Sequence, residues 1–425
     1  MLVPSIDIQS GQAVQLVQGK EKLIDAGDPL AYAQRFCRVG EVAVIDLDAA
    51  LSKGNNDAVI KKIAEQYPVR IGGGIRDLET AFKWLDAGAR KIIIGTKAEV
   101  DFLRQLPQER VIVALDAFNG EIVTHGWTVN TGKKIVDRIL ELKDYVSGFQ
   151  VTFVEKEGMM GGTNLDQVAE IVTAAGKAKV TIAGGVTTAS DLAELDKMGA
   201  DAQVGMALYS GKLSLTEAFL APVNISREDG LIPTVVCNEF GQALGLVWSN
   251  VESVSKSLET GKGIYFSRRR GLWEKGKSSG NTQKLLKVEL DCDRDALLFT
   301  VKQRGSGFCH REQNNCWSDE WGMGKGLVGL SKIIESRRNS VVEGSYTRRL
   351  FTENGLLEAK IIEEAHELIK AERREDVLAE TADLIYFSLV RAIKDGISLA
   401  EISREFDKRN LKVSRRGGDA KVKLG

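Results

Sequence analysis

Short apolar runs alternate with amphipathic stretches through the first half of the chain, from Met1 to about Pro222. The apolar runs have the length of buried strands, and the stretches between them, such as Leu78–Ala87 and Leu165–Ala174, repeat apolar residues at helical spacing. Strands that alternate with helices in this way are typical of a parallel α/β fold. We therefore predict strands over Val42–Leu47, Val69–Ile71, Lys91–Ile94, Val111–Leu115, Phe149–Phe153 and Val180–Ile182.

The same half of the chain contains an internal repeat. Gly72-Gly73 recurs as Gly184-Gly185 at an offset of 112 residues, and Gly95 recurs as Gly205 at an offset of 110. Each half of about 110 residues has room for four strand–helix units. Two such halves favour a (β/α)8 barrel over residues 1–222 rather than an open sheet.

Two kinds of residue stand at the ends of the predicted strands, where barrel enzymes place their chemistry. Glycines there would let backbone N–H groups approach an anion, helped by the helix N-terminus that follows, although they could also serve only as tight turns. Asp7 and Asp116 would face each other across the barrel mouth as a general base and a general acid, unless either one caps a helix. The predicted phosphate-binding residues are Gly73, Gly74, Gly95, Thr96, Gly184, Gly185 and Gly205.

Five stretches of the barrel region carry a resemblance: VPSIDIQSGQAVQLVQG, VRIGGGIRDLETAFKWLDAGARKIIIGT, VALDAFNGEIVTHGW, EKEGMMGGTNLD and IAGGV. Together they resemble the ProFAR isomerase family of histidine biosynthesis over essentially the whole barrel. The resemblance implies an Amadori rearrangement of a substrate with two phosphates. It makes Asp7 the base at the sugar C2 and Asp116 the acid that helps open the ring.

Two positions depart from that family. Glu157 stands in place of the usual catalytic aspartate and is one methylene longer, and Met206 stands where a lysine is common. A misplaced catalytic group can cost orders of magnitude in rate. The barrel is therefore either an active isomerase or a degenerate copy kept as a scaffold. We favour activity, because both phosphate-binding halves and both principal aspartates are present.

A different pattern begins after residue 222, where β-rich runs replace the barrel repeat and three of the five cysteines fall within 25 residues. Alternating aspartates would place three carboxylates on one side of an extended chain, as ligands for Mg²⁺. Three thiolates suit a Zn²⁺ that keeps one position open for water, or a structural zinc with His310 as its fourth ligand. An acidic triplet by itself is usually a solvated loop. The predicted ligands are Asp291, Asp293 and Asp295 for Mg²⁺, and Cys292, Cys309 and Cys316 for Zn²⁺.

This region resembles phosphoribosyl-AMP cyclohydrolase from about Leu231 to Leu330, through LGLVWSNVESVSKSLETGKGIYFSRRRGLWEKGKSSGNTQ, LDCDRDALLF and GFCH. The resemblance implies a β-rich α+β domain at residues 223–330 that works as a homodimer. Zinc hydroxide would add to the purine C6, with Cys292 reaching the site from the partner subunit's side. Asn281 stands where many members have histidine, which leaves His310 as the candidate for proton transfer. The family's substrate-contacting stretch supplies Ser267, Arg268, Arg270, Trp273, Lys275 and Ser279, for which an RNA-binding patch is the alternative.

The last part of the chain has apolar residues at helical spacing in three segments. Glu364 and Glu367 share one helix face, and Glu380 and Asp383 share another. Such a pair is usually solvated, but the second lies within the apolar run TADLIYFSLV. Two facing acidic pairs indicate a Mg²⁺ ion between them.

With SYTRRLF, KIIEEAHEL and ETADLIYFSL, residues 345–413 resemble the all-α phosphoribosyl-ATP pyrophosphohydrolase family. The resemblance implies Mg²⁺-assisted attack of water on a triphosphate, with Glu363 as a further ligand or base. We expect a linker at residues 331–344 and this domain, with a basic tail, at residues 345–425. The cations that could meet the phosphates are Arg348, Arg349 and Lys360.

Composition and charge narrow the alternatives. A net charge of −1 argues against nucleic acid as a partner, and no run of about 18 apolar residues is long enough to span a membrane. The cysteine pattern fits a reducing compartment, and the first residues do not resemble a signal peptide, so we expect a cytoplasmic protein. The three resemblances name consecutive steps of one pathway. We predict phosphoribosyl nucleotides as substrates, Zn²⁺ and Mg²⁺ as cofactors, and a homodimer through the last two domains, with a nucleotide-binding regulator as the rival.

Overall fold

The computed structural model describes residues 1–17, 21–124, 127, 129–156, 162, 164–225, 227–317, 326–338 and 344–414. These residues form two compact units. The first unit contains Met1–Val236, Leu246–Lys302 and the described residues from Leu411 onward, and the second contains Cys237–Gly245 and Gln303–Asn410.

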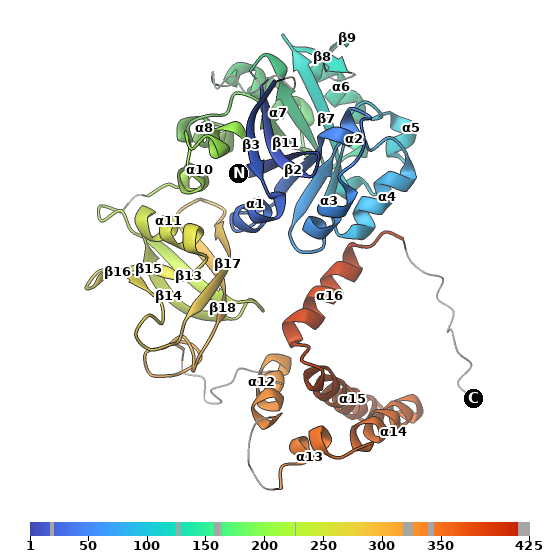
Figure 1. The fold of residues 1–425 in the computed structure, drawn as a ribbon, viewed down its shortest axis with the longest axis vertical. Helices are drawn as coiled ribbons and strands as arrows, with labels where there is room; N and C mark the ends of the chain where they lie inside the picture. Colours follow the sequence, from blue (N-terminus) through green and yellow to red (C-terminus); the bar gives the residue numbers. More distant parts are fainter. Residues whose placement is uncertain are drawn as a thin grey trace. The chain divides into compact units, whose positions relative to one another are not determined.

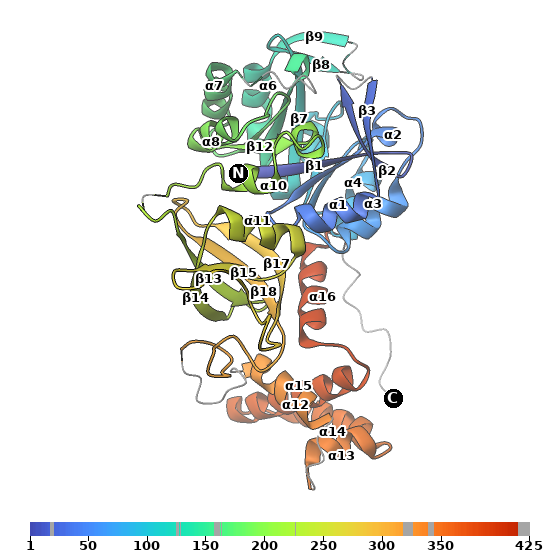
Figure 2. The ribbon, with the colours of Figure 1, turned by 60° about the vertical axis from the view of Figure 1, so that its left-hand side comes forward.

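Eight parallel strands close into a barrel in the N-terminal half (Figure 1). Strand β7 pairs with both β6 and β10, and β12 pairs with β1, so the ring has no free edge. Helices cover its outer face (Figure 2), which explains why most strand residues are buried and apolar. The barrel strands are β1 Leu2–Gln9, β4 Val42–Asp46, β5 Val69–Gly72, β6 Lys91–Ile94, β7 Val111–Phe118, β10 Gly148–Phe153, β11 Lys179–Ala183 and β12 Ala200–Val204.

The predicted (β/α)8 barrel and its two halves are confirmed. An antiparallel pair that the apolar pattern did not predict follows the first strand of each half: β2 (Gln12–Val17) with β3 (Glu21–Gly27), and β8 (Glu121–Thr124) with β9 (Val129–Lys134). The helices are α1 Pro29–Phe36, α2 Leu47–Ala50, α3 Asp57–Ala64, α4 Leu78–Ala87, α5 Val100–Leu103, α6 Ile135–Leu142, α7 Leu165–Ala175, α8 Ala189–Lys197, α9 Met206–Tyr209 and α10 Leu215–Leu220, with 3-10 turns at Gln108–Arg110, Lys143–Tyr145 and Val154–Lys156.

Helix α4 shows how local sequence sets the element boundaries. The Asp77 side chain accepts a hydrogen bond from the backbone N–H of Thr80 at 2.7 Å, which satisfies a donor that the first helical turn leaves unpaired. Gly88 ends the helix at φ 112°, a left-handed conformation that favours glycine. The helix therefore begins and ends where the sequence predicted.

A six-stranded sheet follows the barrel in the order β16-β15-β14-β13-β18-β17. Barrel residue Arg38 contacts both this sheet and the helix packed on it. The Arg38 carbonyl accepts from the N–H of Val288 on β17 at 2.7 Å, and the Arg38 guanidinium donates to the carbonyl of Leu258 on α11. The elements are β13 Ile232–Asn238, β14 Ala243–Ser249, α11 Val251–Thr260, β15 Ile264–Ser267, β16 Gly271–Glu274, β17 Gln283–Leu290 and β18 Leu297–Gln303.

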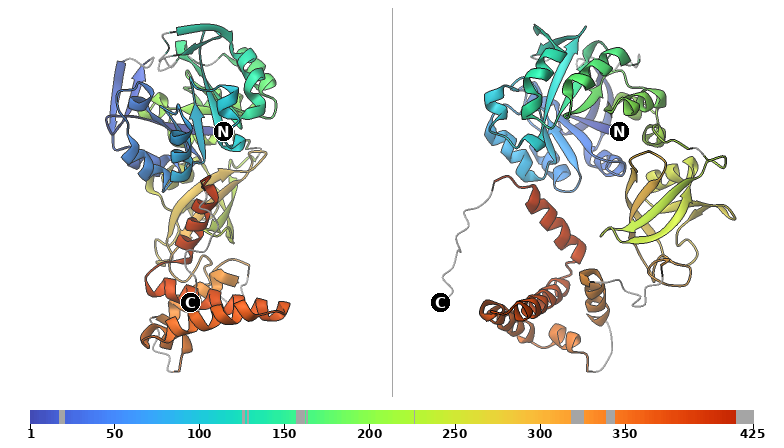
Figure 3. Two further views of the ribbon diagram at one scale, coloured as in Figure 1. Left: turned by 90° about the vertical axis from the view of Figure 1, so that its right-hand side faces the viewer. Right: turned by 180° about the vertical axis from the view of Figure 1, so that it is seen from behind.

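The C-terminal region is helical (Figure 3), and α14 packs along α15. Its core joins residues from four helices: Ile334, Leu350, Leu357, Phe387, Leu389, Val390 and Ile393. The linker predicted at residues 331–344 is wrong for 331–338, which belong to a helix because Ile334 is fully buried in this core. The helices are α12 Gly326–Arg338, α13 Tyr346–Thr352, α14 Leu356–Lys370, α15 Arg374–Lys394 and α16 Leu399–Leu411.

The first described residues of the basic tail are anchored. The backbone N–H groups of Val413 and Ser414 donate to the Asp86 carboxylate at 2.9 and 3.1 Å. None of the described helices is both long enough and apolar enough to cross a membrane.

Candidate functional sites

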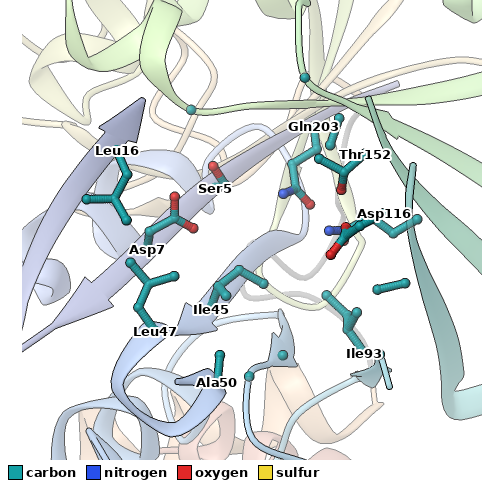
Figure 4. A pocket seen from close by; sticks show the side chains of 18 of the residues that line it. Ser5, Asp7, Leu16, Ile45, Leu47, Ala50, Ile93, Asp116, Thr152 and Gln203 are labelled. Atoms are coloured by element: carbon teal, nitrogen blue, oxygen red, sulfur yellow. The ribbon is translucent and has the colours of Figure 1, made fainter. Parts of the chain in front are cut away.

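A cavity of about 330 Å³ opens where the barrel strands end (Figure 4). Its walls come from the loops after β5, β6, β11 and β12, so both halves of the repeat contribute. Every barrel residue predicted to bind phosphate lies in these walls: Gly73, Gly74, Gly95, Thr96, Gly184, Gly185 and Gly205.

The glycines of the cavity wall are needed for different physical reasons. A Cβ at Gly73 would lie 2.2 Å from the carbonyl oxygen of Asp46, and one at Gly185 would lie 2.6 Å from that of Gly162. Close packing of the turns therefore accounts for these two. Gly95 has no positive φ, and nothing lies within 4 Å of a Cβ built on it. Since the fold leaves this backbone open toward the cavity, Gly95 fits the close approach of a ligand.

Asp7 on β1 and Asp116 on β7 point into the cavity from opposite sides (Figure 4). Burial raises the pKa of Asp7 to about 7, so this carboxyl can exchange a proton at neutral pH. Burial also raises the pKa of Asp116, although the indole Nε1–H of Trp127 donates to its carboxylate at 2.8 Å. Neither aspartate caps the next helix, whose N-caps are Asp28 and Lys134.

Polar side chains that the sequence interpretation missed also line the cavity. Gln150 on β10 and Gln203 on β12 each have a buried Oε1 without a hydrogen-bond partner among the described residues. The sequence feature that could have identified these two residues is a polar glutamine within an otherwise apolar strand. Met206 forms part of the wall and is buried, and Glu157 lies outside the described residues.

Residues 291–295, here called the acidic loop, join β17 to β18. The carboxylate oxygens of Asp291, Asp293 and Asp295 lie within 4.8 Å of one another. The predicted extended chain is wrong: Arg294 has φ 67°, and the Asp291 carboxylate accepts from the N–H of Asp295 at 3.0 Å. The three carboxylates converge because the chain turns, rather than because alternate residues of a strand share one side.

Electrostatics within the acidic loop favour a cation. The negative charge of Asp293 is the largest of the causes that raise the pKa of Asp295. Burial alone would raise the pKa of Asp291, but hydrogen bonds from the N–H groups of Ala296 and Asp295 lower it overall. The loop thus keeps one carboxylate ionised beside others that repel each other, which is a suitable donor set for a hard divalent ion.

The predicted substrate-contacting stretch combines cations with indole rings. The Arg268 guanidinium lies 5.3 Å from the Trp248 ring, and the Arg270 guanidinium lies 5.3 Å from the Trp273 ring. Arg227 stacks on Trp248 at 4.5 Å, a contact that the sequence did not single out. Ser267 ends β15, Ser279 lies in the turn after β16, and the Nζ of buried Lys275 is 5.8 Å from the Trp273 ring.

The cysteines lie in different settings. Cys309 is buried, with its Sγ 3.9 Å from the Nδ1 of exposed His310, whereas Cys292 and Cys316 are exposed. Among the described residues, no group of three or more converging ligand atoms contains a cysteine. The predicted zinc site with Cys292, Cys309 and Cys316 as ligands stays a prediction, because Cys292 belongs to the first compact unit and the other two cysteines belong to the second.

The C-terminal helices bring a second group of carboxylates together, here called the acidic helix cluster: Glu364 and Glu367 on α14 and Glu380 on α15. Their oxygens also lie within 4.8 Å of one another. Burial raises the pKa of Glu380, and the negative charge of Glu367 raises it further. Asp383 and Glu363 are exposed and lie outside the cluster.

The predicted phosphate-binding cations of this region have protein partners. Lys360 lies 2.7 Å from Glu364 and 3.0 Å from Glu363, and these carboxylates raise the pKa of Lys360. Arg349 pairs with Glu353 at 2.6 Å. Lys360 is therefore the cation that contacts the acidic helix cluster directly.

Comparison with known proteins divides the chain into three segments. Residues 1–214 match the family model described as histidine biosynthesis protein. Residues 245–318 match that of phosphoribosyl-AMP cyclohydrolase, and residues 327–410 match that of phosphoribosyl-ATP pyrophosphohydrolase. The order along the chain is the predicted one.

Individual relatives cover different shares of the chain. A histidine biosynthesis bifunctional protein of Schizosaccharomyces pombe is 52% identical over 211 residues, 50% of each chain. A histidine biosynthesis trifunctional protein of Neurospora crassa is 36% identical over 353 residues, 82% of this chain but 38% of the relative. A phosphoribosyl imidazole-4-carboxamide isomerase of Methanocaldococcus jannaschii is 33% identical over 233 residues, 51% of this chain and 97% of the relative. The chain thus spans half or less of the fungal relatives.

Proposed function

The chain belongs to the histidine biosynthesis protein family through residues 1–214, and from this we propose that it carries out three consecutive steps of histidine biosynthesis. The helical domain hydrolyses phosphoribosyl-ATP to phosphoribosyl-AMP and pyrophosphate. The domain built on the six-stranded sheet opens the purine ring to give ProFAR. The barrel isomerises ProFAR to the aminoketose.

One observation carries this proposal: each of the three matched segments contains its own group of converging polar side chains. The barrel has its paired aspartates, the cyclohydrolase-like segment has the acidic loop, and the pyrophosphohydrolase-like segment has the acidic helix cluster. A nucleotide-binding regulator, the rival interpretation, would have no need of two acidic clusters.

The acidic helix cluster supports the first step. Both hydrolase families generally use metal ions. The mutual repulsion of Glu364, Glu367 and Glu380 fits a divalent cation, and oxygen-only donors favour Mg²⁺. A bound Mg²⁺ supplies positive charge to the triphosphate and its leaving group. The chain's own contribution is to hold these carboxylates in place, with Lys360 free to contact a phosphate once the metal takes over its partners.

The second step needs a metal site with soft ligands such as thiolates. The cysteines of this domain support a site that two copies of the chain share. Three thiols suit Zn²⁺, which supplies a hydroxide near neutral pH when bound. Cys292 is exposed and therefore accessible to a second copy. Apolar side chains of this domain are exposed as well, including Leu246 at 57% and Val251 at 55%. On the helical domain Leu378 is 71% exposed, so the proposed homodimer would bury apolar surface in both regions.

The barrel cavity supports the third step. Asp7, with a pKa of about 7, can take a proton from the sugar C2, and Asp116 opposite can give one to the ring oxygen. Gly95, whose backbone is open, and the glycine turns of both halves line the cavity, which supports phosphate binding by these turns.

A second candidate function is favoured by the relatives' names and lengths. The Schizosaccharomyces pombe relative is named bifunctional, and this chain covers only 38% of the Neurospora crassa relative that is named trifunctional. A trifunctional name therefore does not assign three activities to the part shared with this chain. In this alternative, the barrel is a structural module with an inherited cavity, and the chain is a two-step hydrolase.

One experiment separates the two. The purified full chain receives phosphoribosyl-ATP with Mg²⁺ and Zn²⁺, and chromatography against standards follows the products. We expect the aminoketose to form. Asp7→Asn should slow its formation by at least about 100-fold, because a positioned base contributes about 10²–10⁴-fold, while ProFAR accumulates. Asp101→Asn, an exposed barrel residue, is the matched control. A wild-type reaction that stops at ProFAR would establish the structural role instead.

A further inference from the structure

The acidic loop contains one cation, and its side chain leaves the loop. Arg294 stands between Asp293 and Asp295, where an arginine could neutralise its neighbours. Instead its guanidinium makes two parallel contacts with the Asp196 carboxylate of barrel helix α8: Nε to Oδ2 at 3.0 Å and Nη2 to Oδ1 at 3.1 Å. Among the described ion pairs, none joins Arg294 to an aspartate of the loop.

This ion pair is well placed to be strong. The side chains of Arg294 and Asp196 are only 22% and 15% exposed, and two-pronged pairing of guanidinium with carboxylate is geometrically specific. The pairing with Asp196 raises the pKa of Arg294. The Asp196 carboxylate also lies 3.1 Å from the amino group of Met1, so a second positive charge keeps it ionised.

One contact from outside the loop and one within it hold the backbone of the loop. The carbonyl of Arg294 accepts from the N–H of Asn224 at 2.9 Å, and its Nη1 donates to the carbonyl of Asp291 at 2.7 Å. Arg294 has φ 67°, which a non-glycine residue keeps only where surrounding contacts impose it. The turn that gathers the three carboxylates is therefore held both by hydrogen bonds within the acidic loop and by contacts from outside it.

We propose that Asp196 is a positioning residue for the metal ion of the acidic loop, because it draws Arg294 away from the carboxylates. The inference rests on the proposed metal site of the cyclohydrolase-like domain. Without Asp196 the freed guanidinium pairs with Asp293 or Asp295 and competes with the divalent cation. The barrel thereby supports the hydrolytic step that precedes its own, whether or not it is an isomerase.

Lys360 illustrates the competition between a cationic side chain and a metal ion, which Asp196 prevents in the acidic loop. In the acidic helix cluster the nearby cation stays on a cluster carboxylate: the Nζ of Lys360 lies 2.7 Å from Glu364, even though it also lies 3.0 Å from Glu363 outside the cluster. A lysine in that position must give way before a metal ion binds. In the acidic loop Arg294 is already withdrawn.

The test measures metal binding directly, in the metal-free full chain that carries Glu367→Gln and Glu380→Gln to remove the second acidic site. Mn²⁺ serves as the probe, and its binding is followed by electron paramagnetic resonance. We expect Asp196→Asn to raise the dissociation constant about tenfold, since changes to groups that orient metal ligands cost about 10–100-fold in affinity. Glu194→Gln, on the same helix and paired with Lys197, is the matched control and should change nothing.

A second variant identifies the cause. Arg294→Gln removes the competing charge, so adding Asp196→Asn to it should weaken Mn²⁺ binding no further, and thermal unfolding should confirm that the variants remain folded. The proposal is overturned if Asp196→Asn leaves Mn²⁺ affinity unchanged, or if its penalty persists in full beside Arg294→Gln. If the parent chain with both glutamine substitutions binds no Mn²⁺, the proposed metal site itself is wrong, and this inference fails with it.

Discussion

The acidic loop and the acidic helix cluster bring three carboxylates equally close together by different means. In both, the ligand oxygens lie within 4.8 Å of one another. The helix cluster follows from regular spacing, since Glu364 and Glu367 are three residues apart on α14 and face Glu380 on α15. The loop depends on one left-handed residue, Arg294, and on contacts from the barrel. Helical geometry is local, whereas the shape of the loop depends on distant contacts as well as on the loop's own hydrogen bonds.

The two sites also differ in the position of the nearest cationic side chain. Lys360 contacts the carboxylates of the helix cluster, whereas Arg294 is drawn away from those of the loop. The helix cluster is therefore neutralised in part before a metal ion binds, and the loop is not. This difference predicts that the two sites respond differently to substitution, pH and metal removal.

Glu364→Gln should have the largest effect. Glu364 is buried and central to the helix cluster, so its loss should lower pyrophosphate release from phosphoribosyl-ATP by more than about 100-fold, beyond the effect typical of groups that only orient ligands. Opening of the purine ring of added phosphoribosyl-AMP should not change. Glu358→Gln is the control, because this exposed residue of the same helix lies outside the cluster. Equal losses in the two variants would contradict the assignment of the cluster.

Asp293→Asn should have the next largest effect, on the other hydrolytic step. The loop remains folded because Asp291 makes the hydrogen bonds that shape it. Conversion of phosphoribosyl-AMP should fall about 10–100-fold and need more Mg²⁺, while pyrophosphate release stays the same. Steady-state rates against Mg²⁺ concentration check this. Failure of both reactions together would mean that the two sites are not independent.

The helix cluster should also give a pH-dependent stability. The raised pKa of Glu380 means that the folded protein keeps this proton to higher pH than the unfolded chain does. The stability of the metal-free helical domain should therefore fall as pH rises above about 4.5, the ordinary pKa of the group, and Mg²⁺ should reverse the loss. Thermal unfolding across this range measures it. Glu380→Gln should flatten the profile, and a profile that stays equally steep would argue against repulsion within the cluster.

Arg349→Gln should have the smallest effect. The sequence placed this arginine at the phosphates, but in the structure it is 54% exposed and pairs with Glu353. Exposed ion pairs contribute little, so KM for phosphoribosyl-ATP should change by less than about twofold. Lys360→Gln is the informative counterpart, because Lys360 contacts the cluster. A large rise in KM from Arg349→Gln would show that Glu353 releases the arginine when substrate binds.

Periodic patterns in the sequence were sufficient to predict the barrel and the acidic helix cluster. The spacing of apolar residues predicted strand β6 and helix α4 with their observed bounds, and the internal repeat predicted the closed barrel. Glycine and aspartate at strand ends predicted the residues that line the cavity. These predictions succeed because strand alternation, helical turns and the ends of parallel strands are repeated geometries that residue spacing determines directly.

Other features of the fold and of the candidate sites were decided only by the tertiary structure. It made residues 331–338 a helix, because Ile334 finds a core to which distant segments contribute. It turned the acidic loop, which alternation alone had made an extended chain, and it joined Arg294 to Asp196, 98 residues away. Asp383 is exposed and is not among the carboxylates whose oxygens lie within 4.8 Å of one another, so its role as a Mg²⁺ ligand stays a prediction. A sequence determines which faces are apolar and where helices can begin. Which distant charge meets which depends on packing, because an ion pair between remote segments leaves no periodic trace along the chain.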